Sequence, residues 1–316
     1  MLHCLAWNVG VLTGPQQQYV QELVSGRVDG ERVSLFVLGE MGHTQHSFAG
    51  FTGYHGVADP TRSSRGAGRG QGLCVFVRDD LVRLTELVTR THHTVWLRLT
   101  APGHRPLFVC GVYLLPPAGS GAWAALGSDW EDAVAQLQAE IERYRQQGEV
   151  VLLGDFNAHT STLDDRGMGG DEVLDDMGAM GQARAGGAVS TAPPRVNTDR
   201  TPPGSEGRLL VDLCVATKCL ILNGRAPGDE QAAATFVGWP GPSAPASTVV
   251  DYALMALSHG VCSRMSSVLL CTLGIRTRIT TACFCLCGYP WLRLHVLADP
   301  RQSLRNGTLT GGMSFG

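Results

Sequence analysis

The sequence predicts an α/β protein in which helices pack against β-sheets. Residues 129 to 146 have the apolar periodicity of an amphipathic helix, with acidic residues early and arginines late. The apolar run at 150 to 153 follows directly and is typical of a buried strand, as are the runs at 94 to 99 and 107 to 117. Strands and helices that alternate in this way are typical of layered α/β proteins.

Composition indicates a soluble globular chain. Of 316 residues, 44% are hydrophobic and 17% are charged, and the formal net charge of -3 means that nucleic-acid binding would need a local basic patch. The ten cysteines are scattered singly and the N-terminus resembles no secretory signal, so we expect a reducing, intracellular compartment. No apolar run approaches the roughly 18 residues of a membrane span, so no membrane partner is expected. No obligate protein partner is evident.

The segment VVLLGDFNAH, residues 150 to 159, is the first candidate site. Gly154 lets the chain turn after the apolar strand, and Asp155, Asn157 and His159 then occupy alternating positions. Alternation predicts three polar side chains on one side of an extended segment. A strand that runs into a polar turn explains the segment equally well, since Asp and Asn often bond their own backbone.

Other polar residues also follow apolar strands. Glu40 ends the run VSLFVLGE, where a buried carboxylate needs a cation, and this makes it a candidate magnesium ligand. Tyr113 stands near the end of LFVCGVYLLPP. Asp251 follows two valines in STVVDYALMA, where it is either a site residue or the partner of a buried hydroxyl or arginine.

Two loops complete the chain before residue 258. The Gly-rich loop from 60 to 72 carries Arg62, Arg65 and Arg69, which are either phosphate contacts or part of a solvated linker. Residues 160 to 205 hold many Gly, Asp and Pro, and we interpret them as an exposed, flexible insertion.

Five segments in order resemble the endonuclease/exonuclease/phosphatase superfamily. They are the strand ending in Asn8, the strand ending in Glu40, GVYLLPP around Tyr113, GDFNAH at 154 to 159, and STVVDYALM at 247 to 255. ILNGR at 221 to 225, followed by Thr-Phe, resembles most the endonuclease domains of non-LTR retrotransposons. The resemblance covers about residues 2 to 258, and we assign residues 1 to 258 to one domain of this type.

The resemblance implies a deoxyribonuclease-like four-layer α/β sandwich, in which two packed β-sheets are flanked by helices. By the same resemblance Glu40 and Asn8 would hold Mg²⁺, with Mn²⁺ as the other candidate. Asp155 would orient or deprotonate the attacking water, Asn157 would hold the phosphate or the nucleophile, and Tyr113 would contact the phosphate or the leaving oxygen. In-line attack on a phosphodiester requires groups of these kinds.

The chain departs from the family pattern after residue 258. Family members carry a final Ser-Asp-His segment whose His is oriented by the acid equivalent to Asp251, and this sequence has no such segment. We therefore expect residues 259 to 316 to form an aberrant, poorly ordered tail. We also expect the final strand of the family fold to be missing or aberrant. We hypothesise that the reading frame is shifted beyond about residue 277. The shift would come either from an error in the gene model or from decay of the retroelement that encodes the chain. The cysteines in CFCLC at 283 to 287 lack the usual zinc spacing.

The leading functional hypothesis is a magnesium-dependent phosphodiesterase, a retroelement-derived endonuclease that nicks DNA, weak or inactive without the Asp-His motif. DNA is the expected partner, and action on genomic DNA would require the nucleus. A phosphatase or phosphodiesterase acting on a lipid or small phosphoester is a second hypothesis, because one fold supports many chemistries. A catalytically dead remnant, or a nucleic-acid-binding module, is the third.

Overall fold

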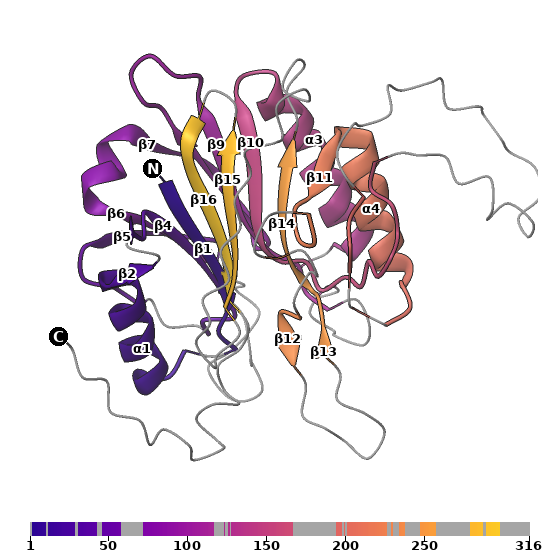
Figure 1. Cartoon of the computed structure of the whole chain (residues 1–316), viewed down its shortest axis with the longest axis horizontal. Helices are drawn as coiled ribbons and strands as arrows, with labels where there is room; N and C mark the ends of the chain where they lie inside the picture. Colours follow the sequence, from indigo (N-terminus) through magenta and orange to yellow (C-terminus); the bar gives the residue numbers. More distant parts are fainter. Residues whose placement is uncertain are drawn as a thin grey trace, which may run out of the picture.

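Two six-stranded sheets packed face to face form the centre of the molecule. The computed structural model describes residues 2–10, 12–28, 31–42, 46–57, 72–116, 123, 126, 128–166, 194–197, 199, 201–225, 229, 234–237, 247–256, 279–286 and 289–297. The first sheet has the order β15-β16-β1-β4-β6-β5 and the second has the order β11-β14-β10-β9-β8-β7. Figure 1 shows the two sheets side by side, with α1 flanking the first and α3 and α4 flanking the second. The four-layer α/β sandwich predicted from the sequence is confirmed.

The strands of the first sheet are β1 (Leu2–Asn8), β4 (Leu35–Gly39), β5 (Phe51–His55), β6 (Cys74–Arg78), β15 (Ile279–Leu286) and β16 (Tyr289–Leu297). The strands of the second sheet are β7 (Thr85–Arg90), β8 (Thr94–Leu99), β9 (Leu107–Tyr113), β10 (Glu149–Asp155), β11 (Cys219–Ile221) and β14 (Asp251–Ala256). The helices are α1 (Gly14–Ser25), the 3₁₀ helix η1 (Asp79–Leu84), α3 (Trp130–Arg145) and α4 (Ser205–Thr217). Two short pairs lie outside the sheets: β2 (Arg27–Val28) with β3 (Glu31–Arg32), and β12 (Phe236–Val237) with β13 (Ser247–Thr248).

Strands β1, β4 and β6 of the first sheet are buried on both faces, and strand alternation sorts their side chains between two clusters. Leu5 and Trp7 of β1 pack in one cluster with Val20 and Val24 of α1. The intervening residues of β1, such as Cys4, belong to the large cluster that also contains the apolar residues of the second sheet. The side chain of Asn8 therefore continues the row that faces the second sheet, which is the basis of the site described below.

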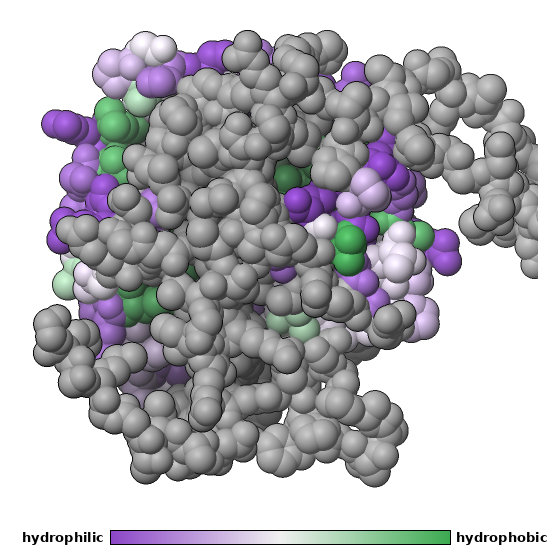
Figure 2. Space-filling model, viewed as in Figure 1, coloured by the Kyte–Doolittle hydropathy of each residue, from purple (hydrophilic) through white to green (hydrophobic). Residues whose placement is uncertain are grey.

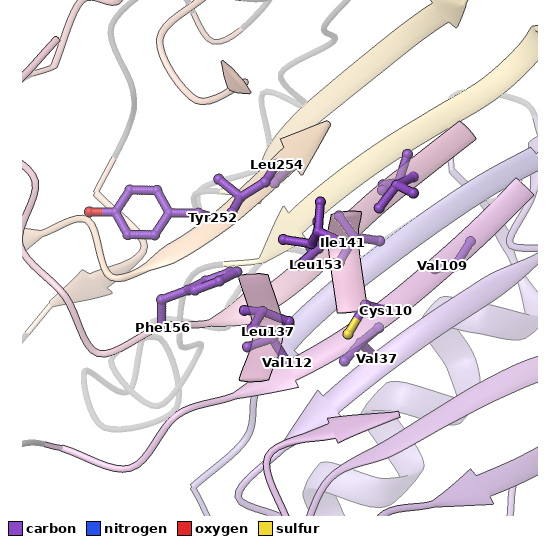
Figure 3. Close-up of a cluster of buried hydrophobic side chains, with 14 of the residues drawn as sticks. Val37, Val109, Cys110, Val112, Leu137, Ile141, Leu153, Phe156, Tyr252 and Leu254 are labelled. Atoms are coloured by element: carbon purple, nitrogen blue, oxygen red, sulfur yellow. The ribbon is translucent and has the colours of Figure 1, made fainter. Parts of the chain in front are cut away.

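Helix α3 covers the outer face of the second sheet, as its sequence predicts. Asp129 caps the helix by accepting a hydrogen bond from Asp132 N at 2.8 Å, and basic residues occupy its last turn. Figure 3 shows Leu137 and Ile141 of this helix in one cluster with labelled side chains from β9, β10 and β14. The rings of Phe108 and Tyr144 stack at 4.8 Å between β9 and α3.

Strands β15 and β16 occupy the edge of the first sheet, where the sequence predicts a final strand that is missing or aberrant. β16 runs parallel to β1, and β15 pairs antiparallel with β16. The register sets Leu292, Leu294 and Val296 beside Leu2, Cys4 and Ala6. This pairing satisfies backbone groups that an unpaired β1 would leave open, so the sheet extends beyond β1.

The segment from 160 to 205, which the sequence predicts to be an exposed insertion, contains buried residues directly after β10. Thr160, Ser161 and Asp165 are all buried. Asp165 forms a buried ion pair with Arg225 at 2.6 Å, which accounts for a carboxylate that lies beneath the surface. Residues 167 to 193 of the insertion lie outside the described residues.

The surface of the described part is mainly hydrophilic in the view of Figure 2, where purple side chains predominate at both flanks and green patches are small. The large hydrophobic residues exposed among the described ones are Tyr19, Val57, Leu87 and Val196. No helix in the described part of the chain is both apolar enough and long enough to cross a membrane.

Gly111 of β9 lies at a close contact between the two sheets. This contact yields a prediction about stability. A Cβ atom at this position would lie 2.5 Å from Val75 Cγ2 and 3.1 Å from Val37 Cγ1. We expect Gly111→Ala to lower the free energy of unfolding by about 1–3 kcal/mol through overpacking, measured by urea denaturation. Gly14→Ala is the matched control, since its Cβ would meet nothing within 4 Å. Equal effects of the two variants would contradict the inferred packing.

Candidate active site

Three polar side chains lie on the inner face of the second sheet, at one end of strands β9, β10 and β14. These strand ends form one edge of the two-sheet sandwich. Asp155, the last residue of β10, pairs with Tyr113 of β9 in parallel register and with Asp251 of β14 in antiparallel register. Directly paired residues point to the same side of a sheet. Gly111, two residues before Tyr113, faces the first sheet, so this whole row faces it. All three side chains are buried.

The first sheet supplies two more residues to the same edge. Asn8 ends β1 and pairs with Gly39, the last residue of β4, and Glu40 follows at once. The amide Nδ2 of Asn8 donates to Asp155 Oδ2 at 2.6 Å. Tyr113 Oη donates to Glu40 Oε1 at 3.0 Å. Two hydrogen bonds thus join the ends of the sheets, and each one links a residue of one sheet to a residue of the other.

The backbone at the site adopts conformations that side chains usually avoid. Glu40 and Asn157 have φ values of 58° and 46°. Gly154 has a φ of 141°, and a Cβ there would lie 2.0 Å from the carbonyl oxygen of Val112, so only glycine fits. Left-handed residues that carry side chains cost conformational energy and cluster at functional sites, so these positions support a functional assignment.

Asn157 is held on both its backbone and its side chain. Its N–H donates to Asp155 Oδ1 at 2.7 Å, and its Nδ2 donates to the carbonyl oxygen of Leu114 at 2.6 Å. The sequence predicts that Asp155, Asn157 and His159 alternate along an extended segment. This is wrong, because β10 ends at Asp155 and the left-handed turn at Asn157 breaks the alternation.

The electrostatics of the site centre on Asp155. Burial raises its pKa well above the usual value, and the negative charges of Asp251 and Glu40 raise it further. The hydrogen bonds from Asn157 N and Asn8 Nδ2 oppose this shift, but they do not cancel it. The site therefore concentrates carboxylates whose mutual repulsion a cation would relieve.

The oxygen atoms at the site are of the kind that Mg²⁺ prefers, and Glu40, Asn8 and Asn157 are the partly exposed residues among those that carry them. Within the described residues, no three His, Cys, Asp or Glu side chains form a metal-binding group by themselves. A cation here would therefore use the Asn8 amide and water in addition to carboxylate. Mg²⁺ sites of one or two carboxylates that retain several waters are common.

Six of the nine predicted site residues are brought together at this edge: Asn8, Glu40, Tyr113, Asp155, Asn157 and Asp251. Arg62, Arg65 and Arg69 lie outside the described residues, as do the side chains of Cys283, Cys285 and Cys287. The structure thus places the first six, and their chemical roles stay predictions.

The motif ILNGR and the Thr-Phe pair support the strand that carries Asp251. Asn223 Nδ2 donates to the Asp251 carbonyl oxygen at 3.2 Å, and Asn223 Oδ1 accepts from Ala253 N at 3.0 Å. Thr235 Oγ1 accepts from Asp251 N at 3.0 Å. These side chains complete backbone hydrogen bonds beside the site, so the motif residues hold Asp251 in position.

Two residues near the site carry no sequence signal that identified them. The ring of His93 lies against that of Trp123 with centroids 4.6 Å apart and a tilt of 34° between the planes, and its Nδ1 lies 3.3 Å from the Tyr113 carbonyl oxygen. Burial lowers the pKa of His93 to about 4, so the ring is neutral at pH 7. The fully buried Tyr252 has its hydroxyl 2.8 Å from the Ala158 carbonyl oxygen, which fixes the loop after β10. Its only sequence cue is its position next to Asp251.

Several solved structures are similar to this chain. The AP endonuclease LMAP from Leishmania major has a TM-score of 0.51 at 12% identity, covering 84% of this chain and 81% of that one. The catalytic domain of Xenopus laevis APE2 has a TM-score of 0.50 at 13% identity, covering 84% and 86%. The endonuclease domain of TRAS1, a telomere-specific non-LTR retrotransposon, has a TM-score of 0.46 at 12% identity, covering 80% and 83%. At these identities the similarity concerns the fold alone.

Among curated proteins, none matches this sequence. The profile described as the Endonuclease/Exonuclease/phosphatase family matches residues 5–256, which span both sheets up to the end of β14 and all six of the assembled polar residues. This match accounts for most of the chain, and the protein belongs to the Endonuclease/Exonuclease/phosphatase family.

Proposed function

We propose that this protein is a magnesium-dependent phosphodiesterase that nicks DNA and derives from a retroelement. The observation that carries the proposal is the pair of inter-sheet hydrogen bonds, Asn8 to Asp155 and Tyr113 to Glu40, which assembles amide, phenol and carboxylate groups at one edge. Membership of a family of nucleases and phosphatases supports a phosphoester substrate. The resemblance of ILNGR to retrotransposon endonucleases supports DNA, and a genomic target would place the protein in the nucleus.

Glu40 and Asn8 are the groups we assign to the cation. The fit rests on the charge of the site, because burial and the neighbouring Asp251 and Glu40 carboxylates hold the pKa of Asp155 high. When bound, Mg²⁺ supplies neutralisation of the charge that develops on the phosphate oxygens. Mn²⁺ accepts similar oxygen ligands and is the other candidate.

Asp155 is the group we assign to the attacking water. Its two oxygens already accept hydrogen bonds from Asn157 N and Asn8 Nδ2, which leaves further lone pairs for a water proton. A carboxylate whose pKa is raised is a better proton acceptor near neutral pH than an ordinary one. Asn157 and Tyr113 would then hold the phosphate and the leaving oxygen.

The absence of a Ser-Asp-His segment from the sequence supports weak rather than full activity, because a missing positioned group costs roughly 10²- to 10⁴-fold in rate. Arg62, Arg65 and Arg69 remain proposed phosphate contacts, since a basic loop binds DNA without sequence preference.

Glu40→Gln tests the nuclease proposal directly. The substitution keeps an oxygen that can accept from Tyr113 Oη but removes the charge, so we expect nicking of supercoiled plasmid in Mg²⁺ to fall by about 10²- to 10³-fold. EDTA should abolish nicking by the wild type. Glu142→Gln, at an exposed position of α3, is the control and should nick normally.

Two results would count against a metal-dependent nuclease: nicking that persists in EDTA, or a Glu40→Gln variant as fast as the wild type. A folded wild type that binds DNA without cutting it would instead support the binding-module hypothesis. Hydrolysis of a lipid or small phosphoester, with no action on plasmid, would support the second enzyme hypothesis.

Tyr113→Phe tests the phenol separately from the metal ligand. Loss of the hydroxyl removes the 3.0 Å hydrogen bond to Glu40 and the proposed phosphate contact, so kcat for nicking should drop about tenfold. Tyr19→Phe, at an exposed ring that packs edge-on to Trp7, should change nothing. Unchanged kcat in Tyr113→Phe would remove this residue from the reaction.

Asp251→Asn tests the repulsion within the site through stability. Because the folded-state pKa of Asp155 is raised, the folded protein holds that proton more tightly, and the free energy of unfolding should fall as pH rises above about 4. Removing the Asp251 charge should make this fall shallower, measured by urea denaturation in EDTA at pH 5 and pH 8. The control Asp212→Asn replaces an exposed carboxylate of α4. Identical pH dependence in wild type and Asp251→Asn would refute the coupling.

A further inference from the structure

The loop that follows β10 is fixed around one residue, His159. Its neighbours Ala158 and Thr160 are both fully buried, and the hydroxyl of Tyr252 contacts the Ala158 carbonyl oxygen at 2.8 Å and Thr160 N at 3.3 Å. Helix α4 packs closely against the backbone of this loop, since a Cβ on Gly207 would lie 1.9 Å from the His159 carbonyl oxygen. The backbone on both sides of His159 is therefore held in place.

The side chain of His159 differs from its surroundings because 34% of it is exposed. Its Nδ1 lies 3.4 Å from Oδ2 of Asp199, a carboxylate that is 2% exposed as a residue. Asp199 is itself anchored, because Thr201 N donates to Oδ1 at 2.8 Å and Val249 N donates to Oδ2 at 3.1 Å. A buried anion thus fixes the orientation of a half-exposed imidazole.

The hydrogen bonds of Asp199 also determine that Nδ1 of the ring carries a proton. Burial alone would raise the pKa of Asp199, but the bonds from His159, Thr201 and Val249 outweigh burial and lower it. An ionised carboxylate can only accept, so Nδ1 of His159 carries the proton that faces it. The other ring nitrogen, Nε2, is left for a partner on the exposed side.

The His159–Asp199 pair is tied to the segments that adjoin the two strands carrying the candidate catalytic carboxylates. His159 lies two residues beyond Asn157, which is at most about 7 Å of chain. Val249, which binds Asp199, lies two residues before Asp251. The backbone of His159 consequently lies next to a site rich in carboxylates, where a nucleic-acid strand needs donors for its phosphate oxygens.

We infer that His159 in its doubly protonated form donates from Nε2–H to a phosphate of the DNA strand next to the one that is cut, while Nδ1–H donates to Asp199, its positioning residue. The inference rests on the proposed function, which supplies DNA as the substrate. The pair contributes to DNA binding and takes no part in bond cleavage.

Two substitutions of His159 separate substrate contact from a structural role. His159→Asn retains a donor near the Nδ1 position, facing Asp199, and has no group at the position of Nε2. His159→Gln does the reverse. We expect His159→Asn to raise the Kd for a fluorescein-labelled DNA duplex in EDTA about tenfold, with Tm unchanged, and His159→Gln to retain most of the affinity. His104→Asn, in the exposed turn between β8 and β9, should leave Kd unchanged.

Binding and nicking assays then test the contact and the nuclease proposal separately. Wild-type affinity in His159→Asn, equal losses of affinity in both His159 variants together with a lower Tm, or a wild type that fails to bind the duplex would each overturn the phosphate contact. If the wild type nicks plasmid while His159→Asn binds normally, the contact fails and the nuclease proposal stands. If nothing is nicked but Kd rises in His159→Asn alone, the nuclease proposal fails and the contact stands.

Discussion

Together with the bond from Tyr113 to Glu40, the hydrogen bond from Asn8 to Asp155 joins the ends of two sheets whose facing sides are packed with apolar residues. It forms only if β1 and β10 keep both their register and their spacing, so the geometry of the site depends on the whole inter-sheet core. Gly111 illustrates this dependence, since its missing side chain lets β9 approach Val37 and Val75. The core thus sets the distance across which the candidate site residues meet.

Charge works against folding at this same edge. Burial and the Asp251 and Glu40 carboxylates raise the pKa of Asp155, and Glu40 and Asn157 adopt left-handed conformations. Such features reduce stability unless a ligand compensates for them. In this protein the compensation within the chain comes from backbone support, including the bonds that Asn223 and Thr235 make around Asp251. A cation and a phosphate would supply the rest.

The family resemblance and the structure agree over β1 to β14 and differ after residue 258. There the sequence lacks the Ser-Asp-His segment, while the backbone still extends the first sheet through β16 and β15. An edge strand pairs with any chain that can adopt an extended conformation, because the hydrogen bonds involve only backbone groups. The chain can therefore complete the sheet without possessing the Ser-Asp-His segment.

Local sequence predicted helix α3 and most of the strands up to β14, and the family resemblance pointed to six residues that the structure brings together. Helix α3 was predictable from its periodicity and charge order, and Glu40 and Asp155 from a carboxylate placed after an apolar strand. Their convergence depended on sheet register, which pairs residues as distant as Asp155 and Asp251. The partnership of His159 with Asp199 and the burial of Asp165 with Arg225 were likewise decided only by tertiary structure. The sequence does not distinguish a polar loop residue that faces solvent from one that bonds a distant partner. Hydrophobic periodicity indicates which face of a helix or strand is buried, and it carries no information about contacts between loops.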